Sequence, residues 1–214
     1  MKRPFRSHRE ARGAEEGQAL LEFTVVITIL LVVLLSVAEL GIIYGRVSSL
    51  GYSSREGART GSALALGEAE LCTSEVRDPS KVDAVLVAAM QRILDSPDSG
   101  IDTADVDQIR IFKADSSGEE ITGTANTWYY EGKGAGPEVD PGPGVARIDF
   151  KAGTVNWPAC DRVNSGASPD SIGVTIRYTH QWVTPLVSFI DSVAGGGLDL
   201  SLTETTVMAL NPTS

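Results

Sequence analysis

The sequence predicts an α+β protein: a long N-terminal transmembrane helix continuing outside the membrane, a second amphipathic helix, then an antiparallel sheet of about four strands. Three observations lead to this fold class. An apolar run lies near the N-terminus, apolar residues recur at helical spacing over 81–94, and alternation with a period of two dominates the later half. Helices followed by strands indicate an α+β domain.

The apolar run is the strongest feature of the chain. Ala19 to Ala38 spans twenty residues, and Glu22 is its only charged residue. A helix of about 20 residues crosses the roughly 30 Å hydrocarbon core of a bilayer. The alternative is a cleaved signal peptide, whose apolar region is about 7–15 residues and ends at a small-x-small site, here Ser36-Val37-Ala38. The length of the run favours an uncleaved anchor.

Charge is distributed unevenly around this run. Residues 1–12 carry five basic side chains against Glu10 alone, whereas the whole chain of 214 residues has a net charge of −10. The positive-inside rule therefore predicts a single-pass protein of the cell membrane with a cytoplasmic N-terminus and an extracytoplasmic C-terminal domain. An acidic domain also argues against binding nucleic acid, which requires clustered Lys and Arg.

Helical spacing continues beyond the anchor without a Pro, and small residues are dense between Gly41 and Gly67. Glycines are kept in helices where another helix approaches closely. We expect one helix beginning near Gln18 and ending between Gly67 and Leu71. The predicted organisation is a basic cytoplasmic leader at 1–17, the transmembrane and extended helix at 18–70, and an extracytoplasmic α+β domain at 71–214.

The rest of the chain is predicted from periodicity and turn residues. An amphipathic helix is expected over Lys81–Leu94 with Ser80 as its N-cap. Strands are expected over 106–113, 127–131, 145–151, 172–180 and 198–208, with a turn at 115–118. A short apolar helix over 185–193 precedes the Gly195-Gly196-Gly197 break.

Cys72 and Cys160 are the only cysteines, and both lie in the part predicted to be translocated. Two lone cysteines in an oxidising compartment most often pair, so we expect a disulfide. A four-ligand zinc site is not indicated, because no His or Cys pair lies near either thiol. No metal site is therefore predicted.

A carboxylate at the start of the anchor forms a candidate site. The window from Gly17 through Gln18 and Glu22 to Phe23 places a small residue at the membrane edge and a carboxylate five positions later. Burying an unpaired carboxylate at the centre of a bilayer costs about 2.5–3.5 kcal/mol. Either Glu22 pairs with an amine freed by cleavage after Gly17, or it lies at the interface at little cost; the spacing leaves both open.

A second candidate site lies in the extended helix and comprises Arg55, Glu56, Gly57, Ala58 and Arg59. The three charges form either a solvated helix face, with Glu56 and Arg59 as a weak pair, or a subunit contact. Their position among small helix-packing residues favours the contact.

Both windows resemble TadE-like proteins of the tight-adherence (Flp-type) pilus system. The start Gly17-Gln-Ala-Leu-Leu-Glu-Phe23 and the segment Arg55-Glu-Gly-Ala-Arg59 stand in the order and spacing of that family, over about the first 65 residues. The resemblance implies a type IV pilin-like part and processing by a prepilin peptidase after Gly17. Gln18 would then be the new N-terminus, with Glu22 and Phe23 as its fifth and sixth residues.

The resemblance implies a non-enzymatic minor pseudopilin or assembly factor, without a cofactor, whose partners are other pilins or pseudopilins and the inner-membrane assembly platform. The alternative is a signal-anchored extracytoplasmic binding domain unrelated to pili, which would carry a flexible linker after the anchor. An enzyme is not indicated, because the only histidines are His8 in the leader and His180 in a predicted strand, and no Gly-rich phosphate loop is present.

Overall fold

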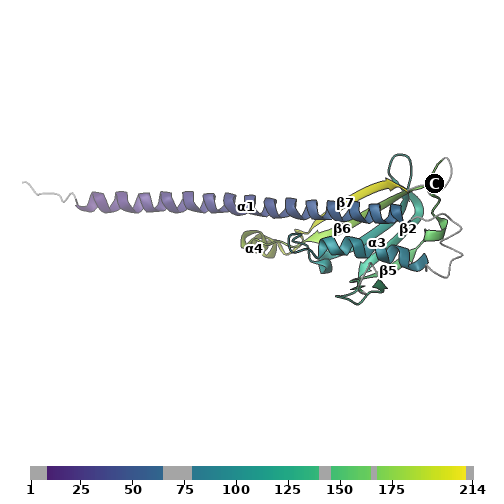
Figure 1. The fold of residues 1–214 in the computed structure, drawn as a ribbon. Helices are drawn as coiled ribbons and strands as arrows, with labels where there is room; N and C mark the ends of the chain where they lie inside the picture. The colour runs from purple at the N-terminus through teal and green to yellow at the C-terminus, as the bar shows by residue number, and fades with distance from the viewer. Residues whose placement is uncertain (1–8, 65–78, 140–145, 165–167, 211–214) are drawn as a thin grey trace, which may run out of the picture. The chain divides into compact units, whose positions relative to one another are not determined.

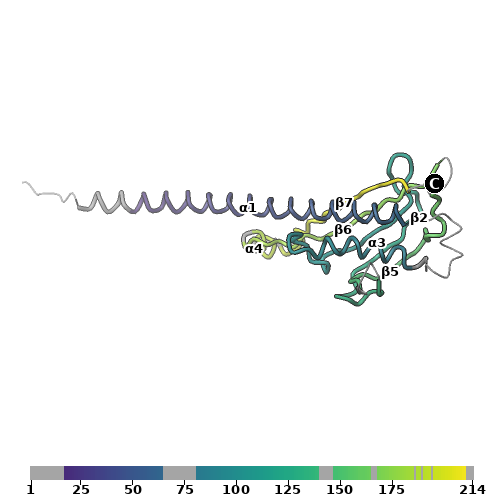
Figure 2. Tube along the Cα trace, viewed as in Figure 1, coloured from purple at the N-terminus to yellow at the C-terminus, as the bar shows by residue number. Residues whose placement is uncertain are grey.

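The computed structural model describes residues 9–64, 79–139, 146–164 and 168–210. Figure 2 draws in grey all residues whose placement is uncertain. The chain divides into two compact units. The first comprises Met1–Gly41 and Trp182–Gly196, and the second comprises Ile42–Gln181 and Gly197–Ser214.

The N-terminal helix α1 is continuous from Arg9 to Ala63. Its start lies nine residues before the predicted Gln18, so the predicted start of the helix is wrong, whereas the basic cytoplasmic leader at 1–17 stays a prediction. Residues 9–17 are rich in Arg, Glu and Ala, which favour helix, and extending an existing helix costs little. The predicted end between Gly67 and Leu71 lies outside the described residues, and α1 ends at Ala63.

The amphipathic helix α3 runs from Pro79 to Leu94, which confirms the predicted helix. Ser80 was expected to be its N-cap, but the helix already includes Pro79. That assignment is wrong because Pro, whose missing N–H would be unpaired there anyway, is well suited to the first turn.

The main sheet is fully antiparallel and has five strands in the order β5-β2-β1-β6-β7, where about four were predicted (Figure 1). Its strands are β1 (Val106–Ala114), β2 (Glu120–Tyr130), β5 (Phe150–Val155), β6 (Ser171–His180) and β7 (Leu200–Ala209). The segment predicted as one strand over 145–151 divides into β4 (Ala146–Arg147), which pairs with β3 (Glu138–Val139), and the start of β5. Single-turn 3-10 helices are η1 (Thr103–Asp105) and η2 (Ala159–Asp161).

One face of the main sheet packs against helices. Buried side chains of β1, β2 and β6 share a single core cluster with Leu50 and Ala58 of α1 and with Leu86 and Met90 of α3. The two helices are in contact, because the Ser53 hydroxyl of α1 donates to the Met90 carbonyl at 3.1 Å. Figure 1 shows α3 beside the C-terminal half of α1.

The other face of the sheet carries a smaller apolar cluster of Phe112, Ala114 and Ala125. Phe112 lies opposite Gly173 on β6, and a Cβ atom at that glycine would come within 2.3 Å of the phenyl ring. A glycine is therefore required there. The polar remainder of this face includes a hydrogen bond of 2.7 Å between the hydroxyls of Thr175 and Thr205.

The first compact unit joins the anchor to the predicted short apolar helix, which the structure confirms as α4 (Pro185–Ala194). Gly195 ends this helix with φ of +89°, a left-handed conformation that favours glycine. The carboxylate of Glu39 accepts hydrogen bonds from the backbone N–H groups of Val183, at 3.2 Å, and of the N-cap Thr184, at 2.8 Å.

Candidate functional site: the exposed face of the N-terminal helix

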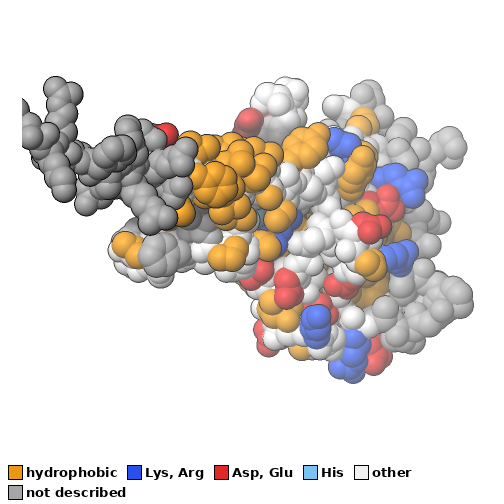
Figure 3. Space-filling view, turned by 90° about the vertical axis from the view of Figure 1, so that its left-hand side faces the viewer, with side chains coloured by type: hydrophobic (Ala, Val, Ile, Leu, Met, Phe, Trp, Pro, Cys, Tyr) orange, Lys and Arg blue, Asp and Glu red, His pale blue; other side chains and the backbone are white. Residues whose placement is uncertain are grey.

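The part of α1 before Gly41 presents apolar side chains outward. Leu20, Phe23 and Ile29 are each at least 60% exposed. Figure 3 shows hydrophobic side chains gathered in a patch on this side of the molecule. By length and composition α1 is the one described helix able to cross a membrane. The chain thus has an N-terminal apolar helix consistent with a single-pass anchor.

Beyond the anchor, Arg46 fixes α1 to the sheet domain. Its Nε donates to the Gly100 carbonyl at 3.0 Å, and its Nη1 donates to the Gln181 carbonyl at 2.8 Å. Nη1 also lies 2.8 Å from Nδ1 of His180, and the guanidinium lies 5.8 Å from the ring centroid of Tyr178. One side chain of α1 therefore contacts both the turn after α3 and the end of β6.

Two ionisable groups near Arg46 have shifted pKa values. Burial raises the pKa of Tyr178, and the nearby positive charge of Arg46 partly opposes that shift. Burial also raises the pKa of Asp105, reinforced by the neighbouring carboxylate of Asp102 and again opposed by Arg46. In both cases the low-dielectric surroundings disfavour the negative form.

The small residues of α1 lie on two different faces. A Cβ atom at Gly57 would come within 2.6 Å of Met90 Sδ, and one at Gly61 within 2.5 Å of Ile172 Cδ1. Gly41 and Gly45 would meet nothing within 4 Å. Gly57 and Gly61 thus allow α1 to approach its own α3 and β6, whereas Gly41 and Gly45 face outward.

We call the exposed strip of α1 beyond the anchor the outer face, comprising Tyr44, Gly45, Ser48, Tyr52, Arg55 and Arg59. Tyr44 is 77% exposed and Tyr52 is 60% exposed, so neither aromatic ring is covered by the described parts of the chain. The members recur at intervals of one to four residues along a single side of the helix.

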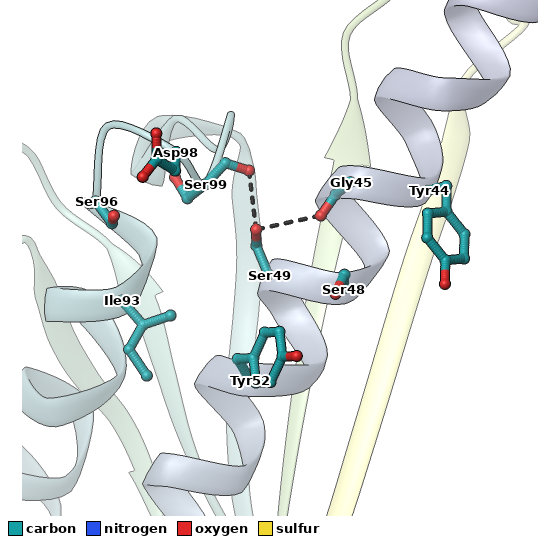
Figure 4. A pocket seen from close by; sticks show the side chains of 9 residues that line it. All are labelled: Tyr44, Gly45, Ser48, Ser49, Tyr52, Ile93, Ser96, Asp98 and Ser99. Carbon is teal, nitrogen blue, oxygen red and sulfur yellow. Dashed lines mark hydrogen bonds between the residues drawn. The ribbon is translucent and has the colours of Figure 1, made fainter.

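A groove borders the outer face on each side. The larger, of about 580 Å³, lies between α1 and the end of α3. Figure 4 shows Ser49 in this groove, with its hydroxyl directed at the Ser99 carbonyl, 3.1 Å away, and at the Gly45 carbonyl. The smaller, of about 240 Å³, is bordered by Gly51 and Arg55 of α1 and by Glu204 of β7. The strip between the grooves is a ridge open to solvent on both sides.

The predicted helix-contact motif at 55–59 contains both buried and exposed residues. Gly57 and Ala58 are buried within the chain, so their small size is explained by packing of the domain itself. Arg55 and Arg59 are exposed. Arg59 pairs with Glu56 at 3.1 Å, and Arg55 lies 5.8 Å from the ring centroid of Tyr52. The charges remain on the solvent side, where a partner can reach them.

The processing window lies in the first turns of the described anchor. Gly17, Gln18, Glu22 and Phe23 are all exposed, and the Gln18 side-chain amide donates to the Glu22 carboxylate at 2.9 Å. This contact spans one helical turn, so Gln18 and Glu22 share one face. Cleavage after Gly17 stays a prediction.

Only one of the two cysteines predicted to form a disulfide lies in the described residues. Cys160 lies in η2, is half-buried and is not free, whereas Cys72 lies outside the described residues. Pairing of the two thiols therefore stays a prediction. Within the described ranges no group of three or more His, Cys, Asp or Glu side chains could hold a metal ion.

His180, the histidine that a hydrolase would require, is 1% exposed and presents Nδ1 to Arg46. An Arg side chain only donates hydrogen bonds, so Nδ1 acts as an acceptor in this contact. The role that the structure gives this ring is to connect β6 to α1.

Sequence reasoning missed three polar side chains that make long-range contacts: Arg46, Glu39 and Arg162. Arg162 is 1% exposed and pairs with Asp83 of α3 at 2.6 Å, with its guanidinium 4.9 Å from the ring centroid of Trp157. For Glu39, the only feature of the sequence that could have indicated a long-range contact is its position directly after the apolar run. For Arg46, the only such feature is its position among apolar residues. No local pattern marks Arg162.

Comparison with known proteins identifies the segment that contains the anchor and the outer face. Residues 17–59 match the family model described as TadE-like protein. No curated protein and no solved structure matches the chain. The match covers about a fifth of the sequence and contains both predicted windows, from Gly17 to Phe23 and from Arg55 to Arg59. The resemblance to TadE-like proteins of the tight-adherence pilus system is thereby confirmed over residues 17–59.

Proposed function

We propose that this chain is a non-enzymatic minor pseudopilin or assembly factor of a tight-adherence (type IV-like) pilus. It is held in the cell membrane by α1, with the N-terminus in the cytoplasm and the sheet domain outside. The TadE-like segment at 17–59 suggests a role in this pilus system. The more specific role rests on how the structure uses that segment.

The observation that carries the proposal is the continuity of α1. The helix runs without interruption through the apolar anchor and on to Ala63, and its later turns are part of the core of the sheet domain. A binding domain merely tethered to the membrane would need only a flexible linker at this place. A helix that is both anchor and structural element instead suits a subunit that packs laterally against other helices.

The outer face supplies a surface for such packing. Gly45 has no side chain and Ser48 has a small one, and close approach of a second helix backbone requires small residues at the contact. The flanking rings of Tyr44 and Tyr52 provide large, rigid contact area with few rotatable bonds. We propose that this ridge receives helices of other pilins or pseudopilins, or of the inner-membrane assembly platform.

The charged end of the outer face gives the contact its polarity. The exposed pair of Arg59 and Glu56 contributes little to stability, about 0–1 kcal/mol for surface pairs in general, so folding does not account for its presence. Arg55 and Arg59 together offer two guanidinium groups to a carboxylate of a partner. Charge complementarity of this kind sets the register and choice of partner more than affinity.

The proposal is tested in a strain from which the gene for this chain is deleted. The chain should restore surface pili, counted by electron microscopy, when it is supplied on a plasmid. A variant with Arg55→Ala and Arg59→Ala should reach the membrane in normal amount and leave fewer pili. Unchanged pili after deletion would favour the alternative, an anchored extracytoplasmic binding domain unrelated to pili.

A further inference from the structure

The helix α4 belongs to the same compact unit as the apolar part of α1. Glu39, the first residue after the twenty-residue apolar run, is 3% exposed and accepts hydrogen bonds from the backbone N–H groups of Val183 and Thr184. The N-terminus of α4, where unpaired N–H groups and the helix dipole favour an anion, is therefore held by a carboxylate of the anchor.

This contact fixes the depth of α4 relative to a bilayer. Because the run from Ala19 to Ala38 is about as long as the hydrocarbon core is thick, Glu39 falls at the boundary between acyl chains and headgroups. The start of α4 lies at the same level, since Thr184 is hydrogen-bonded to Glu39 at 2.8 Å. Trp182, a residue type enriched at this boundary, directly precedes the contact.

The residues of α4 divide into two arcs. At about 100° per residue, the apolar residues occupy an arc of about 160° and the polar ones fall opposite them. The apolar arc contains Leu186, Val187, Phe189, Ile190, Val193 and Ala194, and the polar arc contains Ser188, Asp191 and Ser192.

Two side chains of the apolar arc are exposed. Ile190 is 48% exposed and Val193 is 71% exposed. Large apolar side chains concentrated on one side of a helix normally mark an interaction surface. The helix has no Lys or Arg, so its contact with a membrane would rest on apolar burial rather than on attraction to anionic headgroups.

We propose that α4 is an interfacial helix that lies in the bilayer surface, with Ile190 and Val193 at the level of the upper acyl chains and the serines of its opposite arc in water. Glu39 positions it there by binding its N-terminus. The chain thus contacts lipid at a second place, which ties the connection between β6 and β7 to the membrane. This inference requires that α1 spans the membrane but does not depend on a role in pili.

Site-specific photochemistry in native membranes tests this placement. A diazirine-bearing aliphatic amino acid replaces Ile190 or Val193 in the full chain. Ser192, exposed on the polar arc of the same helix, is the matched control, and Val26, 63% exposed in the apolar part of α1, is the positive control. After illumination, the intact mass of each purified protein shows whether a phospholipid has been added.

We expect a phospholipid adduct at positions 26, 190 and 193, and at least about tenfold less at position 192, since an interfacial helix buries only one arc. Equal lipid labelling of positions 190, 193 and 192 would overturn the placement. So would a crosslink from position 193 to a second copy or to another protein in place of lipid. Failure at position 26 as well would show that the anchor itself is misassigned.

A second measurement uses hydrogen exchange of the full chain in liposomes. The double variant Ile190→Ser and Val193→Ser should raise the exchange rate of the α4 amides at least about tenfold, because the helix loses its lipid contact. The matched variant Ser188→Ala and Ser192→Ala should keep the wild-type rate. Equal rates in the two variants would contradict the proposal.

Discussion

Nη1 of Arg46 lies 2.8 Å from Nδ1 of His180 and joins the N-terminal helix to the end of strand β6. The two residues are 134 positions apart. Arg46 is the first charged residue after Glu39 in α1, so this contact lies where the helix leaves the anchor and enters the sheet domain. The same guanidinium also binds the carbonyls of Gly100 and Gln181.

Replacing Arg46 should destabilise the sheet domain. Arg46→Met keeps much of the apolar stem but removes three hydrogen bonds and leaves the buried Nδ1 of His180 without this donor. We expect a loss of about 2–4 kcal/mol in the free energy of unfolding, measured by urea titration of the full chain in detergent.

Arg59→Met is the control for this variant, because Arg59 pairs with Glu56 on the surface. It should change the same free energy by less than about 1 kcal/mol. Equal effects of the two variants would show that Arg46 does not hold α1 to the domain.

The same substitution should destabilise the protein at one glycine of α1 and have little effect at another. Gly61→Val pushes a side chain into Ile172 and Leu86, and overpacking of this kind costs about 1–3 kcal/mol. Gly45→Val meets open space and should leave the free energy of unfolding within about 0.5 kcal/mol of wild type. Thermal unfolding in detergent compares the two, and a stable Gly61→Val protein would contradict the described packing of α1 on β6.

The buried pair of Arg162 and Asp83 should show strong coupling. Arg162→Met alone leaves the carboxylate of Asp83 buried without its cation, which costs about 3–5 kcal/mol. Adding Asp83→Leu removes that charge, so the double variant should be more stable than Arg162→Met. A double-mutant cycle of unfolding free energies tests this, and additive losses would show that the two charges do not interact.

These long-range contacts mark the limit of what the sequence predicts. Local periodicity was sufficient for the anchor, for α3 over 79–94 and for β6 over 171–180, because each buries one regular face. It could not show that Arg46 meets His180 or that Arg162 meets Asp83, since such pairs depend on the tertiary arrangement. The strand predicted over 145–151 was misplaced, because β5 is an edge strand whose residues after Phe150 are exposed and show no alternation of buried and exposed side chains.

Only part of the candidate site could be predicted, because local sequence patterns do not show which side of a helix packs within the chain. The motif from Arg55 to Arg59 was located by resemblance, yet only the structure separates its buried members, Gly57 and Ala58, from the exposed arginines. The outward position of Gly45 follows from which face of α1 packs on the sheet. Glycine density alone does not distinguish packing within one chain from packing between chains.

Processing of the leader has a direct test. If a prepilin peptidase cuts after Gly17, the intact mass of the protein from native membranes should correspond to a chain that starts at Gln18. Gly17→Leu should abolish that mass, because the peptidase requires the small residue. A full-length mass in both the wild type and Gly17→Leu would show an uncut anchor.

The same mass measurement tests the disulfide. If Cys72 and Cys160 are paired, the chain measured without reductant is lighter by two hydrogen atoms than after reduction.

The most direct test of the pilus role is photo-crosslinking from the outer face in piliated cells. A photoreactive residue at Ser48, exposed between the two grooves, should crosslink to a pilin, a pseudopilin or a protein of the assembly platform, identified by mass spectrometry. The same residue at Ser117, in the exposed turn between β1 and β2, should give no such product. Crosslinks from Ser48 to pilus proteins would support the proposed function, and their absence in a piliated cell, with Ser48 labelled only by water or lipid, would contradict it.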